Sequence, residues 1–342
     1  MVYLIAHWGD FMHAYDRISR YKGALMGIAI LIVVYGHLLY YHSGLKDYAQ
    51  LNITEWYTVG SVDIFLFLSG FGIYHSLKRN SDSLRFMQRR LERLLPSYLP
   101  FILVYCAFML WADQMNKWQA VGNLTTFGWW AQIGAQFNWY IPTLIGLYLL
   151  SPLLFAVIER YEKKALWMFL ALFLLEGACV GTSLMIGVSR FPVYFLGMYL
   201  GHEAASGKQP SRRHLVISGV LAVISMIALY FLVVYFPGSL NRYGFWWHPF
   251  LLSTPGCVYF VTWLMEKQER WKVTRAWNKG LTFLGGKSFE IYLCHIFIYT
   301  VGLYFGIRSW GKWILLAILG IIVGVAYGKL VEYFTAWRKR RS

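Results

Sequence analysis

Two histidines and an aspartate lie inside long apolar stretches of this sequence, where ionisable side chains are rare. His37 belongs to the apolar run from 27 to 40, Asp63 to the segment from 60 to 71, and His295 to the segment from 285 to 295. A neutral imidazole can take a proton near pH 7 or carry an acyl group, and a carboxylate can orient an imidazole. The three residues are therefore candidate catalytic groups.

Arg90 and Arg93 are spaced one helical turn apart, directly before another apolar segment. This spacing puts both guanidinium groups on one helix face at a membrane boundary. Such a pair can hold a phosphate or a pyrophosphate. Taken alone, a cluster of arginines at such a boundary is more often a signal of membrane topology.

The intramembrane residues also have simpler interpretations. Asp63 can form a hydrogen bond between packed helices, and His295 can be a core histidine with its hydrogen bonds satisfied. Two further carboxylates in apolar segments, Glu176 and Glu290, can pair with Arg190 or Lys287. The assignment of chemistry therefore depends on the combination of segments and not on any one residue.

The elements that must position these residues are membrane helices. Of the 342 residues, 58% are hydrophobic and 14% charged, and the mean hydropathy is +0.46, which is typical of a chain folded in lipid. The sequence contains apolar runs long enough to cross a bilayer. Because these runs lack the two-residue alternation of membrane strands, they are expected to be helical. We predict an all-α, polytopic membrane helix bundle that forms a single domain over residues 1–342. About ten transmembrane helices are expected, at 23–42, 57–77, 94–112, 139–158, 165–185, 190–202, 215–236, 248–265, 281–304 and 313–335.

The net charge of +16 comes from 32 Lys and Arg residues, most of which fall on alternate loops. By the positive-inside rule this pattern puts both termini in the cytoplasm. It also favours contact with anionic lipid headgroups, so we expect membrane lipids and no nucleic acid as partners. No cleavable signal peptide is expected at the start of the chain. The four cysteines lie in apolar segments without metal-ligand spacing, so neither a disulfide nor a metal site is predicted.

In order, these segments resemble the acyltransferase-3 family of integral membrane O-acyltransferases over nearly the whole chain. The resemblance rests on six ordered motifs: Ile30 to His37; Val62-Asp63-Ile64-Phe65 with Ser69-Gly70; Arg90, Arg93, Pro96 and Tyr98; Trp139-Tyr140 with Leu147 to Pro152; Arg190-Phe191-Pro192 with Leu196-Gly197-Met198; and Gly285 to His295. One position departs from the family pattern, because Met26 stands where the family has a basic residue eleven positions before the histidine. Lys22, one turn earlier, can reach toward that place by snorkelling.

The resemblance implies transfer of an acyl group, most often acetyl from acetyl-CoA, to a hydroxyl of a cell-envelope glycan or lipid-linked sugar. It implies catalytic roles for His37, Asp63 and His295, and binding of the acyl-CoA donor by Arg90, Arg93, Lys22 and Tyr98. The expected location is the bacterial plasma membrane. Two alternatives stay open: a transporter or flippase that uses the same intramembrane groups as a pathway, and a sensor that keeps the fold without the chemistry.

Overall fold

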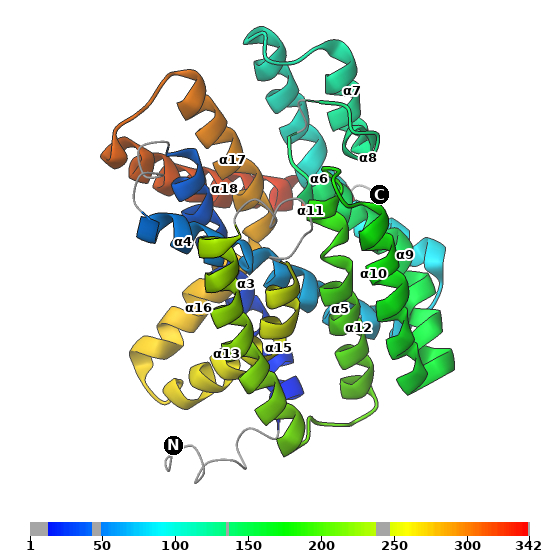
Figure 1. The fold of residues 1–342 in the computed structure, drawn as a ribbon. Helices are drawn as coiled ribbons and strands as arrows, with labels where there is room; N and C mark the ends of the chain where they lie inside the picture. Colours follow the sequence, from blue (N-terminus) through cyan, green and yellow to red (C-terminus); the bar gives the residue numbers. More distant parts are fainter. Residues whose placement is uncertain (1–12, 43–48, 135–136, 237–246, 341–342) are drawn as a thin grey trace. The chain divides into compact units, whose positions relative to one another are not determined.

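A computed structural model describes residues 13–42, 49–134, 137–236 and 247–340 (Figure 1). Within these ranges the regular structure is helical and contains no strand, in agreement with the predicted all-α class. Long apolar runs fold this way because a helix satisfies its backbone hydrogen bonds within one segment. The chain divides into two compact units, each assembled from segments that are distant in the sequence.

The first unit contains Met1–Ala29, Val59–Asp82 and Leu150–Gly285. Its helices pack closely where glycines remove the side chain between two backbones. A Cβ atom at Gly197 on α12 would collide with the backbone of Phe67 on α5, and one at Gly256 on α15 would collide with Ser218 on α13. The helices of this unit are the first part of α3 (Ala14–Tyr41), α5 (Ser61–Arg79), the end of α9 (Tyr140–Tyr161), the 3₁₀ helix η2 (Glu162–Trp167), α10 (Met168–Ala178), α11 (Met185–Val188), α12 (Phe191–Ala205), α13 (Arg212–Tyr235), α15 (Trp247–Gln268) and α16 (Lys272–Gly286).

The second unit contains Ile30–Thr58, Ser83–Leu149 and Gly286–Ser342. Its closest helix pair is α17 and α18, which Figure 1 shows side by side in orange and red. The helices of this unit are the end of α3, α4 (Ala49–Val59), α6 (Ser83–Trp111), α7 (Lys117–Thr125), α8 (Phe127–Trp130), the start of α9, α17 (Ser288–Tyr304) and α18 (Trp310–Lys339).

Each of the ten predicted segments contains a helix, but not every one is long enough to cross a bilayer by itself. Among the described residues, six helices combine sufficient length and apolarity, or seven if α16 and α17 together form one broken span. The six are Ala14–Tyr41, Thr54–Arg79, Ser83–Trp111, Tyr140–Ala178, Arg212–Tyr235 and Trp310–Arg338. Two predicted spans are represented by shorter helices, α10 with 11 residues and α12 with 15.

Candidate active site

The second unit brings the two intramembrane histidines into direct contact. The Nδ1 atom of His37 on α3 lies 2.9 Å from Nε2 of His295 on α17, and the two rings are nearly parallel. The exposure of the two side chains differs, since His295 is completely buried whereas His37 is half-buried. His37 is therefore the more accessible member of the pair.

The hydrogen bonds of His295 determine the tautomers of both rings. Its Nδ1 atom lies 2.8 Å from the carbonyl oxygen of Ile291, and because a carbonyl oxygen can only accept, Nδ1 carries the proton. A fully buried imidazole without a carboxylate partner is favoured in its neutral form, so its Nε2 atom accepts from Nδ1–H of His37. The Nε2 atom of His37 then keeps its lone pair, which is the state of a general base.

Aromatic side chains surround the histidine pair within the same unit. Tyr299 packs edge-on against His295, and its hydroxyl donates to the carbonyl oxygen of Val34, 3.1 Å away, one turn before His37. Tyr41 packs against both His37 and Trp313. These contacts fix the part of α3 that carries His37 against α17 and α18.

Three tyrosines of this unit lie near the histidine pair or near Arg90. The ring of Tyr292 lies 5.7 Å from that of His295 and 5.1 Å from that of Tyr140. Two turns further along α9, the ring of Tyr148 lies 5.9 Å from the guanidinium carbon of Arg90. Tyr140, beside Tyr292, and Tyr148, beside Arg90, thus lie on one helix of this unit, α9.

The two arginines have different surroundings. The guanidinium group of Arg90 is half-buried and stacks on Phe86, 5.1 Å from the ring centre. Arg93 is exposed, and both arginines are close enough to Tyr148 to interact with it electrostatically. Arg93 is therefore the more accessible of the two guanidinium groups, whereas Arg90 also contributes packing.

Tyr98 and its neighbour Ser97 bind other parts of the protein. The Tyr98 hydroxyl is buried and donates to the carbonyl oxygen of Asn123 at 2.6 Å, which joins α6 to α7. Ser97 donates to Glu290 on α17 at 2.5 Å. In this structure Tyr98 contributes to packing, and its predicted contact with the acyl donor stays a prediction.

Asp63 and Arg190 form an ion pair in the first unit. Both side chains are completely buried, and the Arg190 Nε atom lies 3.7 Å from Oδ2 of Asp63. Arg190 also donates through Nη1 to the carbonyl oxygen of Ile186. The ion pair joins α5 to the beginning of α12. The Asp63 carboxylate thus has an arginine partner, and its predicted role in orienting an imidazole is untested.

Lys22 points toward α5 within the first unit. Its Nζ atom occupies the space where a side chain at Gly72 would begin, and its charge acts on His75. Met26, one turn later on α3, is half-buried. The long lysine side chain is thus directed to the neighbouring helix, and its proposed role toward the donor remains a prediction.

Comparison with known proteins identifies the family. A family model described as an acyltransferase domain, that of the acyltransferase-3 family, matches residues 24–329, nearly the whole chain. The chain belongs to the acyltransferase-3 family. No curated protein and no solved structure matches it. Together with the apolar helices, family membership makes this acyltransferase a multi-pass membrane protein.

Two carboxylates of the acyltransferase have partners other than those suggested by the sequence. Glu176 lies 3.1 Å from Nε2 of His248, and Lys287 forms its ion pair with Glu332. Glu290, as described above, accepts from Ser97. Within the described residues, no group of three or more His, Cys, Asp or Glu side chains is arranged to hold a metal ion.

Sequence reasoning missed the glycines of α18 that set the position of α17. Gly320, Gly324 and Gly328 recur every four residues and face His295, Ile291 and Lys287 in turn. A repeat of this kind inside an apolar segment is the usual signature of close helix packing in membranes. The spacing was present in the sequence and could have marked α18 as a closely packed helix.

Proposed function

We propose that the acyltransferase moves an acyl group, acetyl from acetyl-CoA, to a hydroxyl of a cell-envelope glycan or of a lipid-linked sugar. The contact between His37 and His295 is the observation that carries this proposal. It leaves a lone pair on the more accessible histidine, as a base for a hydroxyl requires. Family membership supports the reaction class.

In the proposed reaction His37 Nε2 takes the proton of the acceptor hydroxyl. At the same time the hydroxyl oxygen attacks the thioester carbonyl carbon of the donor. A carbon–oxygen bond forms, the carbon–sulfur bond breaks, and the thiolate of coenzyme A receives the proton from His37. His295 holds the His37 ring through Nδ1 and stabilises the imidazolium that exists between the two proton transfers. His295 is therefore a positioning residue.

The donor is proposed to bind with its phosphates at Arg93 and Arg90 and its pantetheine arm along Tyr148, Tyr140 and Tyr292. Guanidinium forks suit phosphate oxygens, and a thin, mostly apolar arm suits an aromatic wall. Two tyrosines support this placement, because α9 carries Tyr140 beside Tyr292 and Tyr148 beside Arg90. Lys22 and Tyr98 are kept as proposed donor ligands on the family resemblance, although in this structure Lys22 is directed to α5 and Tyr98 joins α6 to α7.

The proposed topology has ten spans and both termini in the cytoplasm of a bacterial cell, with the protein in the plasma membrane. The alternating charge of the loops supports it. It places Arg90 and Arg93 on the side of the membrane where coenzyme A is found. Asp63 is retained as a proposed catalytic residue on the family resemblance, although in this structure its partner is Arg190 and not an imidazole.

The decisive experiment follows acetyl transfer by the full-length protein purified in detergent. Labelled acetyl-CoA is supplied with a panel of glycan and lipid-linked sugar acceptors, and release of the coenzyme A thiol is measured in parallel. We expect His37→Ala to lower the rate about 100-fold or more without loss of expression. His42→Ala removes a buried imidazole five positions later on the same chain segment and is the matched control. Near-normal transfer by His37→Ala would remove His37 from the catalytic role.

A transporter is the second candidate, and the completely buried Asp63–Arg190 ion pair is the observation that favours it. Calorimetric titration with acetyl-CoA separates the two functions. An acyltransferase binds the donor, and a transporter for another substrate does not. A folded preparation that fails to bind acetyl-CoA at millimolar concentration would reject the enzyme.

A further inference from the structure

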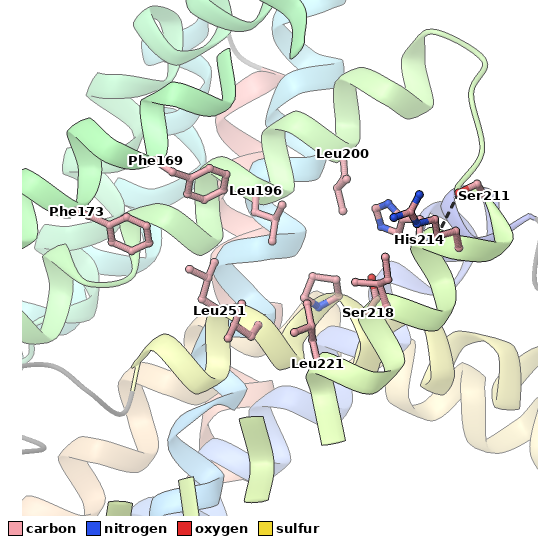
Figure 2. A pocket seen from close by; sticks show the side chains of 13 residues that line it. Phe169, Phe173, Leu196, Leu200, Ser211, His214, Ser218, Leu221 and Leu251 are labelled. Carbon is pink, nitrogen blue, oxygen red and sulfur yellow. Dashed lines mark hydrogen bonds between the residues drawn. The ribbon is translucent and has the colours of Figure 1, made fainter. Parts of the chain in front are cut away.

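A groove in the first unit is lined by none of the residues assigned to acyl transfer. It has a volume of about 590 Å³ and is lined by residues of α10, α12, α13 and α15 (Figure 2). This volume falls within the range of about 300 to 1,000 Å³ that is common for small-molecule sites. The groove contains none of the histidines, arginines or tyrosines of the proposed active site.

The lining of the groove changes from apolar to cationic along its length. Figure 2 shows Phe169 and Phe173 at one end and Ser211 and His214 at the other, with leucines between them. Ser211 caps α13 by accepting from the backbone N–H of His214, and the His214 ring contacts the hydroxyl of Tyr259 at 3.2 Å. Arg213 lies in the same turn and is exposed, and the lining residues include no carboxylate to neutralise it.

The apolar part of the groove opens toward the lipid-facing side of α13. Only 22% of the most apolar window of α13 is buried inside the protein. Two lining residues are also substantially exposed, Ile217 at 46% and Leu252 at 44%. In a membrane these side chains meet acyl chains, so a lipid can enter the groove sideways without crossing a polar barrier.

We propose that this groove is a binding site for an anionic phospholipid. One acyl chain lies along the leucine and phenylalanine wall, and the phosphodiester of the headgroup pairs with Arg213. A zwitterionic lipid with a choline headgroup fits less well, because its outer positive charge lies near an arginine that the groove leaves without a carboxylate. This site goes beyond acyl transfer and needs none of the residues assigned to that reaction.

Competition between two lipids tests the proposal on the full-length protein in detergent. Equal amounts of phosphatidylglycerol and phosphatidylcholine are added, and the lipids that the protein retains are counted by native mass spectrometry. We expect phosphatidylglycerol to be preferred, and Arg213→Gln to reduce that preference about fivefold. Arg212→Gln is the matched control, because Arg212 is the adjacent arginine and does not line the groove.

A second pair of variants tests the apolar wall. Ile217→Trp puts a large side chain into the open part of the groove and should lower lipid retention, whereas Val216→Trp adds the same bulk at an exposed position outside it. Equal retention of the two lipids by the wild type, or equal effects of the two arginine variants, would overturn the proposal. Unchanged retention in a folded Ile217→Trp variant would do so as well. If that variant does not fold, the arginine pair decides.

Discussion

Gly320 on α18 lies directly against His295 on α17. A Cβ atom added at Gly320 would be 2.7 Å from the Cβ atom of His295 and 2.9 Å from its Cα atom, closer than real side chains approach. The backbone of α17 is therefore as close to α18 as a glycine permits. Because His295 holds the ring of His37, the packing of two helices sets the geometry of the proposed base.

Gly320→Ala is expected to lower acyl transfer about 100-fold, because the added methyl group displaces His295 and a shift of about 1 Å in a catalytic group has an effect of that size. Gly311→Ala is the control in the same helix, since a Cβ atom there meets nothing within 4 Å. Initial rates of acetyl transfer and acetyl-CoA affinity are measured together. The affinity for acetyl-CoA should change little, because Arg90 and Arg93 are both on α6. Equal rates for the two variants would contradict the argument.

Substitution of His295 tests the assignment of tautomers. His295→Ala removes the acceptor for Nδ1–H of His37 and should lower the rate, though less than His37→Ala does. His295→Gln offers an amide oxygen as a replacement acceptor and should recover part of the loss. The measurement is the rate for each variant, supported by ¹⁵N shifts of the His37 ring nitrogens. A glutamine variant no better than the alanine variant would indicate that His295 acts by packing alone.

The sequence was sufficient to predict the helices but not their lengths. Every predicted segment contains a helix because long apolar runs leave the backbone no other partner in lipid. Segment 165–185 instead forms a 3₁₀ helix and the short α10, and then turns at Gly181, whose φ of 80° is accessible to glycine. The first span is longer than predicted, as α3 begins at Ala14 and its first turns are held by an ion pair of Arg17 with Glu266.

The candidate site could be predicted by residue type and not by pairing. An imidazole in an apolar run indicates function wherever its partner lies, so His37 and His295 were found separately. Their contact joins helices at opposite ends of the chain and depends on the glycines of α18, which periodicity alone does not connect to α17. For Asp63 the sequence suggested an imidazole partner, and the structure shows Arg190, because two separate motifs meet where α5 packs on α12.

The buried ion pair predicts a specific pattern of stability. Asp63→Asn leaves a buried guanidinium without its countercharge and should destabilise the fold by about 3 to 5 kcal/mol. The double variant Asp63→Leu with Arg190→Met removes both charges and should recover much of that loss. Thermal unfolding in detergent measures both effects. Additive losses in the double variant would show that the two charges do not depend on each other.

The proposed topology predicts which loops an external reagent reaches. Single cysteines in a cysteine-free background are placed at Lys117, the first residue of α7, and at Arg79 and Arg212, which lie at cytoplasmic ends in the ten-span scheme. An impermeant thiol reagent added to intact cells should label the first and not the other two. Permeabilised cells are the control for reactivity. Labelling of Arg79→Cys or Arg212→Cys in intact cells would show that this loop faces the outside and that the proposed topology is wrong there.

The last prediction separates the two arginines of the proposed donor site. Arg93 is exposed and free of the stacking that holds Arg90, so Arg93→Gln should weaken acetyl-CoA binding by about 1.5 to 3 kcal/mol, the usual value of a hydrogen bond to a charged group, with little change in stability. Arg90→Gln should weaken binding and also lower the melting temperature, because its guanidinium packs on Phe86 and Tyr148.

Arg93→Lys should bind acetyl-CoA better than Arg93→Gln but less well than the wild type, since lysine lacks the planar fork. Arg89→Gln changes an exposed neighbour and is the control. Titration calorimetry gives the affinities of the five proteins. If Arg93→Lys and Arg93→Gln both bind acetyl-CoA as tightly as the wild type, Arg90 and Arg93 are only a signal of membrane topology. The phosphates of the donor would then lack their proposed ligands.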